Sequence, residues 1–284
     1  TLALWQELKK EVQIQDLFAI VALEQEVFPC LVDMKWKGVR ISEDQVNILE
    51  KKLQVTYDAC IDRIKDATGI TPEIWAAKSV AKVFDKLGLK YDRTEKTGAP
   101  SFTKNSLSRN KNKVVKSIAK ARQMDKLKNT FLHSLKNFMY NGRIHSDIHQ
   151  LRGDQGGTVT GRLSYSHPNL QQLPNYSKEG MGIRSIFIPE EGCKWGCFDY
   201  SQQEPRLVVH YALQTPGVMG LGDIVEQYRQ GKADFHSIVA DIAEIDRAEA
   251  KTINLGLFYG MGQAKLQAQL GIDDSDTAKA LLKK

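Results

Sequence analysis

Hydrophobic side chains recur at helical spacing over much of the first 140 residues. Residues 1–28 carry apolar positions three or four residues apart, which predicts helical structure. Residues 29–41 lose this spacing and predict a short extended turn. After Ser42, a residue suited to capping a helix N-terminus, a long amphipathic pattern runs to about Ala67. The first part of the chain therefore predicts mainly helices.

Two further helical stretches follow on either side of a polar loop. Residues 76–86 predict a short helix that stops at Gly88. Residues 92–103 contain a Gly-Ala-Pro sequence and predict the loop. Residues 113–139 predict a second long helix.

The pattern changes to alternation after residue 141. Period-two alternation and short apolar runs favour strands, and longer periodic segments favour helices. We expect strands over 143–149, 185–189 and 195–200, then a helix over 202–213 and further helices from Gly222 to the end. The last two strands are expected to share a sheet, so the fold class is α+β.

Composition indicates a folded protein with a sizeable core. The 284 residues are 42% hydrophobic and 26% charged. No apolar run approaches the ~18 residues of a membrane span, so we expect no membrane partner. The four cysteines, at 30, 60, 193 and 197, do not have the usual zinc spacing. Reduced thiols and a cytoplasmic protein are expected.

Positive charge is concentrated in one stretch of the chain. The net charge is +6, but the ten Lys and Arg residues between Lys104 and Lys136, with Asp125 as the only acid, give that stretch +9. The remainder of the chain therefore sums to −3. A local basic stripe favours a polyanionic partner, although a solvated helix face would explain the same charges.

Carboxylates stand near the end of a predicted strand. Asp199 lies in the run Phe198-Asp199-Tyr200 at the end of the predicted strand. Glu204 follows five residues after Asp199. An exposed carboxylate is the hard oxygen ligand that Mg²⁺ prefers. Capping of the next helix is the structural alternative for such an aspartate.

A later segment places unlike groups on one helix face. Arg247, Lys251, Asn254, Leu255 and Tyr259 fall within roughly 140° of each other at about 100° per residue. Cations suit a triphosphate, and a flat ring suits a base or sugar. A cationic amphipathic helix is the simpler alternative.

Long polar side chains also surround a glycine turn. Arg162 lies in Thr-Gly-Arg-Leu-Ser, and Asn169 and Gln171 follow. They suit contacts with a nucleic-acid groove or sugar. Taken alone, they would equally suit a solvated loop.

The order of these segments is more specific than any one of them. TVTGRLSYSHPNLQQLP, FDYSQQEPRLVVHYA and RAEAKTINLGLFYGMG resemble, in succession, three signatures of family A DNA polymerases. The second is similar to motif A of the family and the third to motif B on its O helix. TEKTGAPSFT and GRIHSDIHQ also resemble family segments, so the resemblance covers nearly the whole chain. The residues of these segments are most similar to those of phage-type members.

The resemblance implies a right-hand architecture of helical thumb, antiparallel-sheet palm and helical fingers. It implies the following division: 1–15 as the possible tail of an upstream exonuclease-like domain, 16–41 as a palm-associated segment, 42–140 as thumb, 141–214 as palm with motif A, and 215–284 as the start of the fingers with the motif B helix.

The resemblance also implies roles for individual residues in template-directed DNA synthesis on a primer-template with dNTPs. Asp199 and the Tyr200 carbonyl would bind two Mg²⁺ ions, and Glu204 would exclude a ribose 2′-OH. Arg247, Lys251 and His236 would hold the triphosphate, Lys251 also acting in catalysis, while Leu255 would face the sugar and Tyr259 would stack at the insertion site. Contacts to DNA would come from Arg162, Asn169 and Gln171, and from the thumb lysines Lys116, Lys120, Lys126 and Lys128.

Two departures from the family pattern qualify this reading. Leu255 stands where many members carry Phe or Tyr, so sugar discrimination is open. No His-Asp pair of motif C occurs in the chain, so the second metal-binding carboxylate is expected beyond Lys284. A catalytically incomplete primer-template-binding module therefore remains an alternative. A related single-subunit RNA polymerase is a second alternative. Glu204 is evidence against it, because a residue that excludes a ribose 2′-OH would exclude ribonucleotides.

Overall fold

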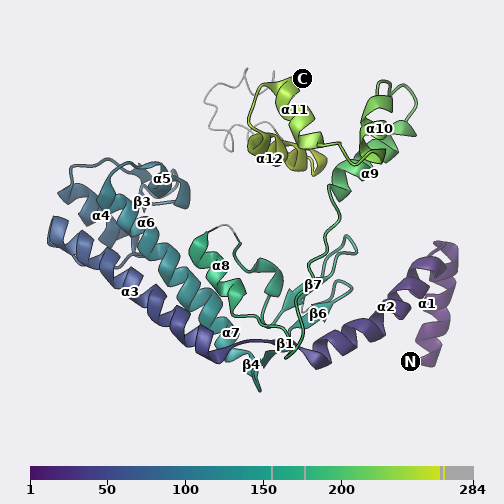
Figure 1. The fold of residues 1–284 in the computed structure, drawn as a ribbon, viewed down its shortest axis with the longest axis horizontal. Coiled ribbons are helices and arrows are strands. Elements are labelled where there is room, and N and C mark those ends of the chain that lie inside the picture. The colour runs from purple at the N-terminus through teal and green to yellow at the C-terminus, as the bar shows by residue number, and fades with distance from the viewer. Residues whose placement is uncertain (155, 176, 263–264, 266–284) are drawn as a thin grey trace. The chain divides into compact units, whose positions relative to one another are not determined.

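The computed structural model describes residues 1–154, 156–175, 177–262 and 265, with the side chains of residues 242, 243 and 248 left out (Figure 1). Residues 1–195 form one compact unit and residues 196–284 a second.

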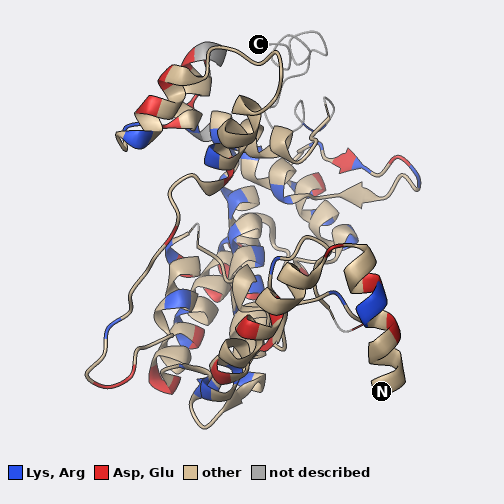
Figure 2. Cartoon of the chain, turned by 90° about the vertical axis from the view of Figure 1, so that its right-hand side faces the viewer, with Lys and Arg blue, Asp and Glu red and all other residues tan. Residues whose placement is uncertain are grey.

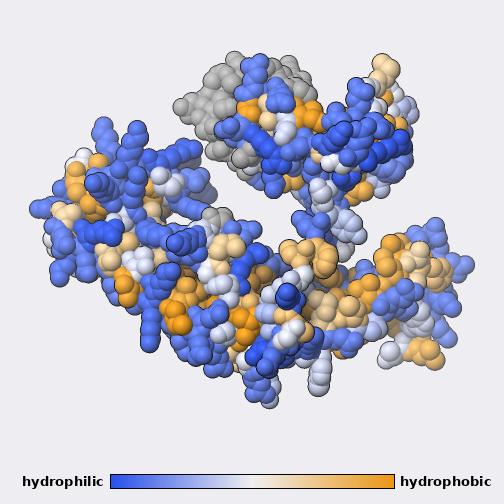
Figure 3. All heavy atoms as spheres, viewed as in Figure 1, coloured by the Kyte–Doolittle hydropathy of each residue, from blue (hydrophilic) through white to orange (hydrophobic). Residues whose placement is uncertain are grey.

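The first unit begins with two helices, α1 (Leu2–Ile14) and α2 (Phe18–Lys37). The prediction of an extended turn over 29–41 is wrong for residues 29–37, because α2 continues through Pro29 and ends at Gly38. Proline removes one amide donor, and here the helix extends beyond that loss. Gly38 has φ of 65°, and a Cβ there would meet the His145 ring at 2.7 Å, so glycine is required. Exposed apolar side chains gather along α1 and α2 (Figure 3).

Two long helical segments form the main body of the first unit. Helix α3 (Glu43–Thr68) packs along α6 (Lys113–Asp125), which continues through a π-helical segment η1 (Lys126–Leu132) into α7 (His133–Asn137) (Figure 1). The Ser42 hydroxyl accepts a hydrogen bond from the Gln45 amide at 3.3 Å, as the capping sequence predicts. Both predicted long helices are therefore confirmed.

Shorter elements complete this helical body. Helices α4 (Ala77–Lys86) and α5 (Lys104–Arg109) flank the predicted polar loop, whose ends pair as β2 (Asp92–Arg93) and β3 (Pro100–Ser101). One buried cluster includes Leu53, Leu127, Leu135, Ile144 and Ile183, and a second includes Ile64, Val83, Phe84, Leu107 and Ile118. Acidic and basic residues both occur along the helices (Figure 2).

Small antiparallel sheets join the ends of the helices. Strands β1 (Val39–Arg40), β5 (Arg143–Ile144) and β4 (Met139–Tyr140) form a sheet in the order β1-β5-β4. Strand β6 (Asp147–His149) pairs with β7 (Ser164–Ser166). A 3₁₀ turn η2 (Leu170–Gln172) and α8 (Lys178–Ser185) follow. These elements confirm the α+β class, with the alternating segment 143–149 divided between two sheets.

The strands predicted over 185–189 and 195–200 are not found. Ser185 ends α8, and only Phe187 forms an isolated bridge, with Ile41. Residues 195–200 are irregular, and Phe198 is 95% exposed. A strand needs a neighbour to satisfy its backbone groups, and no strand within the described part of the chain pairs with this segment.

The second unit is helical where it is described. Its helices are α9 (Gln203–Leu213), α10 (Gly222–Arg229), α11 (Phe235–Ala243) and α12 (Arg247–Phe258). Val209, Tyr228 and Ala233 form its buried cluster. These helices confirm the prediction up to residue 258, and the helical expectation for residues 266–284 lies outside the described residues. In neither unit does a described helix have the length and apolarity needed to cross a bilayer.

Candidate active site

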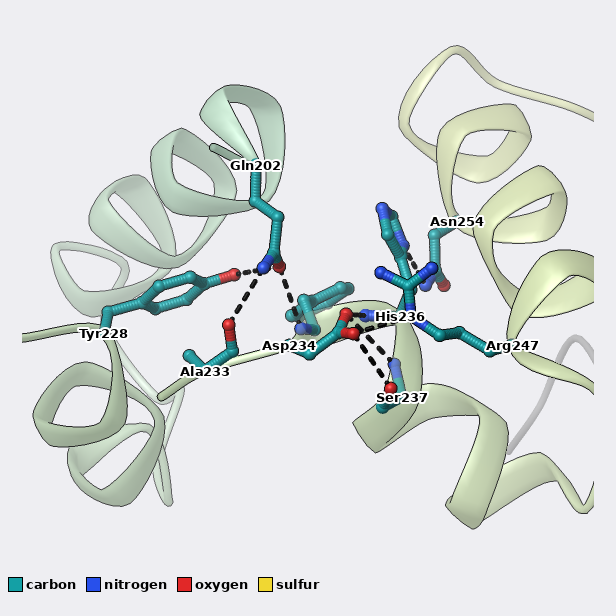
Figure 4. Close-up of polar contacts among 9 residues, drawn as sticks. Gln202, Tyr228, Ala233, Asp234, His236, Ser237, Arg247 and Asn254 are labelled. Atoms are coloured by element: carbon teal, nitrogen blue, oxygen red, sulfur yellow. Dashed lines mark hydrogen bonds and ion pairs between the residues drawn. The ribbon is translucent and has the colours of Figure 1, made fainter. Parts of the chain in front are cut away.

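Gln202 organises the start of helix α9. It adopts a left-handed conformation, with φ of 53°, directly before the helix. Its Nε2 donates to the Ala233 carbonyl at 2.8 Å, and its Oε1 accepts from the Phe235 amide at 2.9 Å and from the Tyr228 hydroxyl at 3.3 Å (Figure 4). One side chain thereby ties α9 to α10 and to the entry of α11. The sequence did not predict this role. Its one indication is a long side chain with a terminal amide just before a helix.

Glu204 lies in the first turn of α9 and is half-buried. Its carboxylate accepts a hydrogen bond from the hydroxyl of Tyr259, the residue that ends α12. The structure therefore brings together the acid of the DYSQQE segment and the phenol of the later helix.

Asp234 accepts hydrogen bonds at both of its carboxylate oxygens. It caps α11, because Oδ1 accepts from the amides of His236 at 3.2 Å and Ser237 at 3.4 Å. Oδ2 accepts from the Ser237 hydroxyl at 3.0 Å and from Arg247 Nε at 2.6 Å (Figure 4). The hydrogen bond from Arg247 is the main reason that the pKa of Asp234 falls from 3.8 to about 2.

His236, two residues after Asp234, is buried, with 5% of its surface exposed. Its Nδ1 lies 3.1 Å from Nδ2 of Asn254, a residue that is itself only 3% exposed (Figure 4). With the Asn254 amide nitrogen facing the ring, Nδ1 accepts in the tautomer that carries its proton on Nε2. Burial lowers the pKa of His236, and the nearby Arg247 and Lys251 lower it further against the opposing charge of Asp234.

Helix α12 divides the residues that the sequence placed on one face. Arg247, Lys251 and Tyr259 are exposed and Leu255 is half-buried, whereas Asn254 is buried against α11. Asn254 therefore faces α11 and not solvent, and its amide is the partner that the buried imidazole requires. Asp234, which holds Arg247, was also missed, although Asp before Phe-His-Ser is a helix-capping signal.

Asp199 and Tyr200 lie in the irregular segment before α9, and both are exposed. An exposed carboxylate beside a backbone carbonyl can offer two oxygen ligands to a hard cation. Among the residues that the structure describes, no three His, Cys, Asp or Glu side chains are grouped to hold a metal ion.

In the first unit, two of the three polar residues around the glycine turn at Gly161 stabilise their own loop. Asn169 caps the 3₁₀ turn by accepting from the Gln171 amide at 3.0 Å, and Gln171 Nε2 donates to the Leu163 carbonyl at 3.0 Å. Arg162 is exposed, and its carbonyl accepts from the Thr158 hydroxyl at 2.7 Å.

The basic stripe contains two kinds of lysine. Lys116 and Lys126 are exposed. Lys120 forms an ion pair with Glu179 at 2.6 Å, and Lys128 donates to Gln54 at 2.6 Å. Internal partners thus account for part of the concentrated charge, as they do for Lys136 with Glu50 at 2.8 Å.

Known proteins are similar to this chain over most of its length. A DNA-directed DNA polymerase of Pseudomonas phage M6 is 35% identical over 281 residues, which cover 93% of this chain and 42% of that protein. DNA polymerase DpoZ of Acinetobacter phage SH-Ab 15497 is 34% identical over 298 residues, covering 95% of this chain and 46% of that protein. The chain thus spans less than half the length of these phage relatives.

Solved structures agree with the sequence matches. The POL domain of Pol1 from M. smegmatis, in a complex with DNA primer-template and dNTP, matches with a TM-score of 0.79 and 25% identity, covering 99% of this chain and 50% of that one. The model of DNA polymerase family A matches residues 43–284. The chain belongs to DNA polymerase family A.

Proposed function

We propose that this chain contributes the nucleotide-selecting residues of a template-directed DNA polymerase, which adds deoxynucleotides to a primer 3′ end. The observation that carries the proposal is the hydrogen bond between Glu204 and Tyr259. It joins the two segments that resemble motifs A and B of the family, as a shared nucleotide pocket requires. Synthesis would take place in the cytoplasm of a bacterial or phage-infected cell.

The triphosphate of a dNTP would be held by the groups at the start of α11 and along α12. Arg247 and Lys251 are exposed cations, and the Nε2–H of neutral His236 is a further donor. Phosphoryl transfer depends on positioning and on neutralising phosphate charge more than on covalent chemistry. Lys251 would act in catalysis by the same means, stabilising charge on the transferring phosphate.

The donor chemistry of Asp199 fits a share in a magnesium site. Its exposed carboxylate and the Tyr200 carbonyl are oxygen ligands of the preferred kind, and a second carboxylate would complete the ligand set. When bound there, Mg²⁺ would supply Lewis-acid chemistry at the primer hydroxyl and at the charge of the leaving group.

Selection of the sugar would depend on Glu204. A pocket that merely fits deoxyribose rejects an added hydroxyl weakly, so a fixed group must occupy the 2′ position. The hydrogen bond from Tyr259 restrains the Glu204 carboxylate in this role. The Tyr259 ring would stack with the incoming base pair, and Leu255 would face the sugar.

Primer-template DNA would contact the first unit. The exposure of Lys116 and Lys126 supports contacts with phosphates, to which Lys120 and Lys128 would add. Arg162, Asn169 and Gln171 would line the minor groove near the primer end. The ranges 42–140, 141–214 and 215–284 would then be thumb, palm and fingers, after the exonuclease-like tail at 1–15 and the palm-associated segment at 16–41.

Primer extension with the complete product of the gene encoding these residues tests the proposal. Four templates that differ in the first templating base are each offered the four dNTPs singly. Addition of only the complementary dNTP is expected. Tight primer-template binding without any extension would instead indicate a binding module, and extension that ignores the template would contradict a polymerase of this kind.

A further inference from the structure

We infer that Asp234 is a positioning residue that aims the guanidinium of Arg247 at the triphosphate, an inference that rests on the proposed function. The carboxylate would not touch the nucleotide. It would act entirely through Arg247, whose Nε it holds at 2.6 Å.

The direction of the Asp234 carboxylate is fixed by the backbone. Oδ1 accepts from two consecutive amides at the start of α11, and the Ser237 hydroxyl binds Oδ2. A carboxylate held at both oxygens cannot turn freely to follow a mobile partner. Arg247 therefore has to adopt the orientation that Oδ2 offers.

The pairing leaves the phosphate-binding edge of Arg247 outside the ion pair. Asp234 contacts Nε, so the four N–H groups of Nη1 and Nη2 lie beyond this contact. Because the guanidinium is planar, fixing Nε also fixes the plane in which those donors point. Two parallel N–H donors are the arrangement that binds phosphate oxygens in a bidentate manner.

Charge alone does not explain why an acid stands here. A negative side chain next to a cation that binds a triphosphate weakens the attraction for the phosphate, since it cancels part of the positive charge. Its presence is consistent with a gain in orientation that exceeds this loss. A purely structural alternative is that Asp234 only caps α11.

Asparagine separates these two roles. In Asp234→Asn, the remaining oxygen still accepts from the amides of His236 and Ser237, and asparagine caps helices as well as aspartate. The ion pair is lost, because a neutral amide replaces the charged oxygen. Asp234→Ser is a second capping variant without the carboxylate. Asp246→Asn is the matched control, since Asp246 precedes Arg247, is exposed and makes no side-chain cap bond.

The experiment measures single-nucleotide addition and nucleotide binding with the complete gene product. We expect Asp234→Asn and Asp234→Ser to lower kcat/KM for the dNTP at least tenfold, with primer-template Kd and Tm close to wild type and Asp246→Asn within twofold of it. Binding of the next complementary dNTP to a dideoxy-terminated primer complex should weaken in parallel.

A double-mutant cycle decides whether Asp234 acts through Arg247. In an Arg247→Ala background, Asp234→Asn should cause no further loss of dNTP binding. An equal loss in both backgrounds would overturn the inference in favour of a structural role, as would Asp234→Asn that binds dNTP like wild type. An inactive wild-type protein would refute the proposed function instead, and the dNTP-binding cycle would still decide the role of Asp234.

Discussion

The hydroxyl of Tyr259 donates a hydrogen bond to the carboxylate of Glu204, which links the end of α12 to the first turn of α9. The two residues are separated by 55 positions in sequence. The contact restrains a half-buried acid, as a group that is proposed to exclude a 2′-OH would need to be restrained.

Replacing Glu204 with Ala should therefore raise ribonucleotide use. We expect the ratio of kcat/KM for ribonucleotide over deoxyribonucleotide to rise by about 10-fold or more, because an added hydroxyl is otherwise rejected weakly. Tyr259→Phe is the matched variant, since it keeps the ring and removes the hydroxyl that donates to Glu204, and a smaller rise is expected. A ratio within twofold of wild type for Glu204→Ala would refute the role of Glu204 in excluding the 2′-OH.

The exposed lysines of the basic stripe should set part of the salt dependence of DNA binding. Each phosphate contact contributes about 0.9 to the slope of log affinity against log salt. Changing both Lys116 and Lys126 to Ala should flatten that slope by about 2, equally for all DNA sequences. The control changes Lys9 and Lys10 of α1, two exposed lysines outside the stripe. If the slope stays as in wild type, the stripe is a solvated helix face.

Burial of His236 should make folding stability depend on pH. Its pKa is lowered by burial, with contributions from Arg247 and Lys251 against Asp234, so the unfolded chain binds more protons than the folded one just below pH 6.5. Stability therefore rises with pH through this interval and falls on acidification. Urea unfolding between pH 5 and 7.5 should show a shallower dependence for His236→Gln. His210→Gln, at an exposed site on α9, should keep the wild-type dependence; equal slopes for wild type and His236→Gln would contradict the account.

Local signals predicted the helices well. Ser42 and Gln45 at one end and Gly69, with φ of 74°, at the other define α3 as the sequence suggests, because caps act within a few residues. The extended turn expected over 29–41 is not found up to residue 37, since the helix continues beyond the missing donor of Pro29. The strand expected over 195–200 failed because strands depend on neighbours that a local pattern does not reveal.

Some residues of the candidate site could be predicted from the sequence, whereas the residues that support them could not. Arg247, Lys251, Glu204 and Tyr259 stand out by type and spacing. Gln202, Asp234 and Asn254 act through contacts with residues up to 33 positions away, and such contacts follow only from the packing of α9, α11 and α12.

Asp199 is an exposed carboxylate that would bind magnesium for phosphoryl transfer. The decisive measurement is the single-turnover rate of one dNTP addition by the complete gene product, in wild type and Asp199→Ala, with Asp223→Ala on α10 as an exposed acidic control. The account predicts a loss of at least about 1000-fold for Asp199→Ala, with primer-template Kd unchanged within twofold, because charge neutralisation by metal is removed without touching the DNA contacts. An Asp199→Ala protein that extends the primer at a tenth of the wild-type rate or faster would contradict the account.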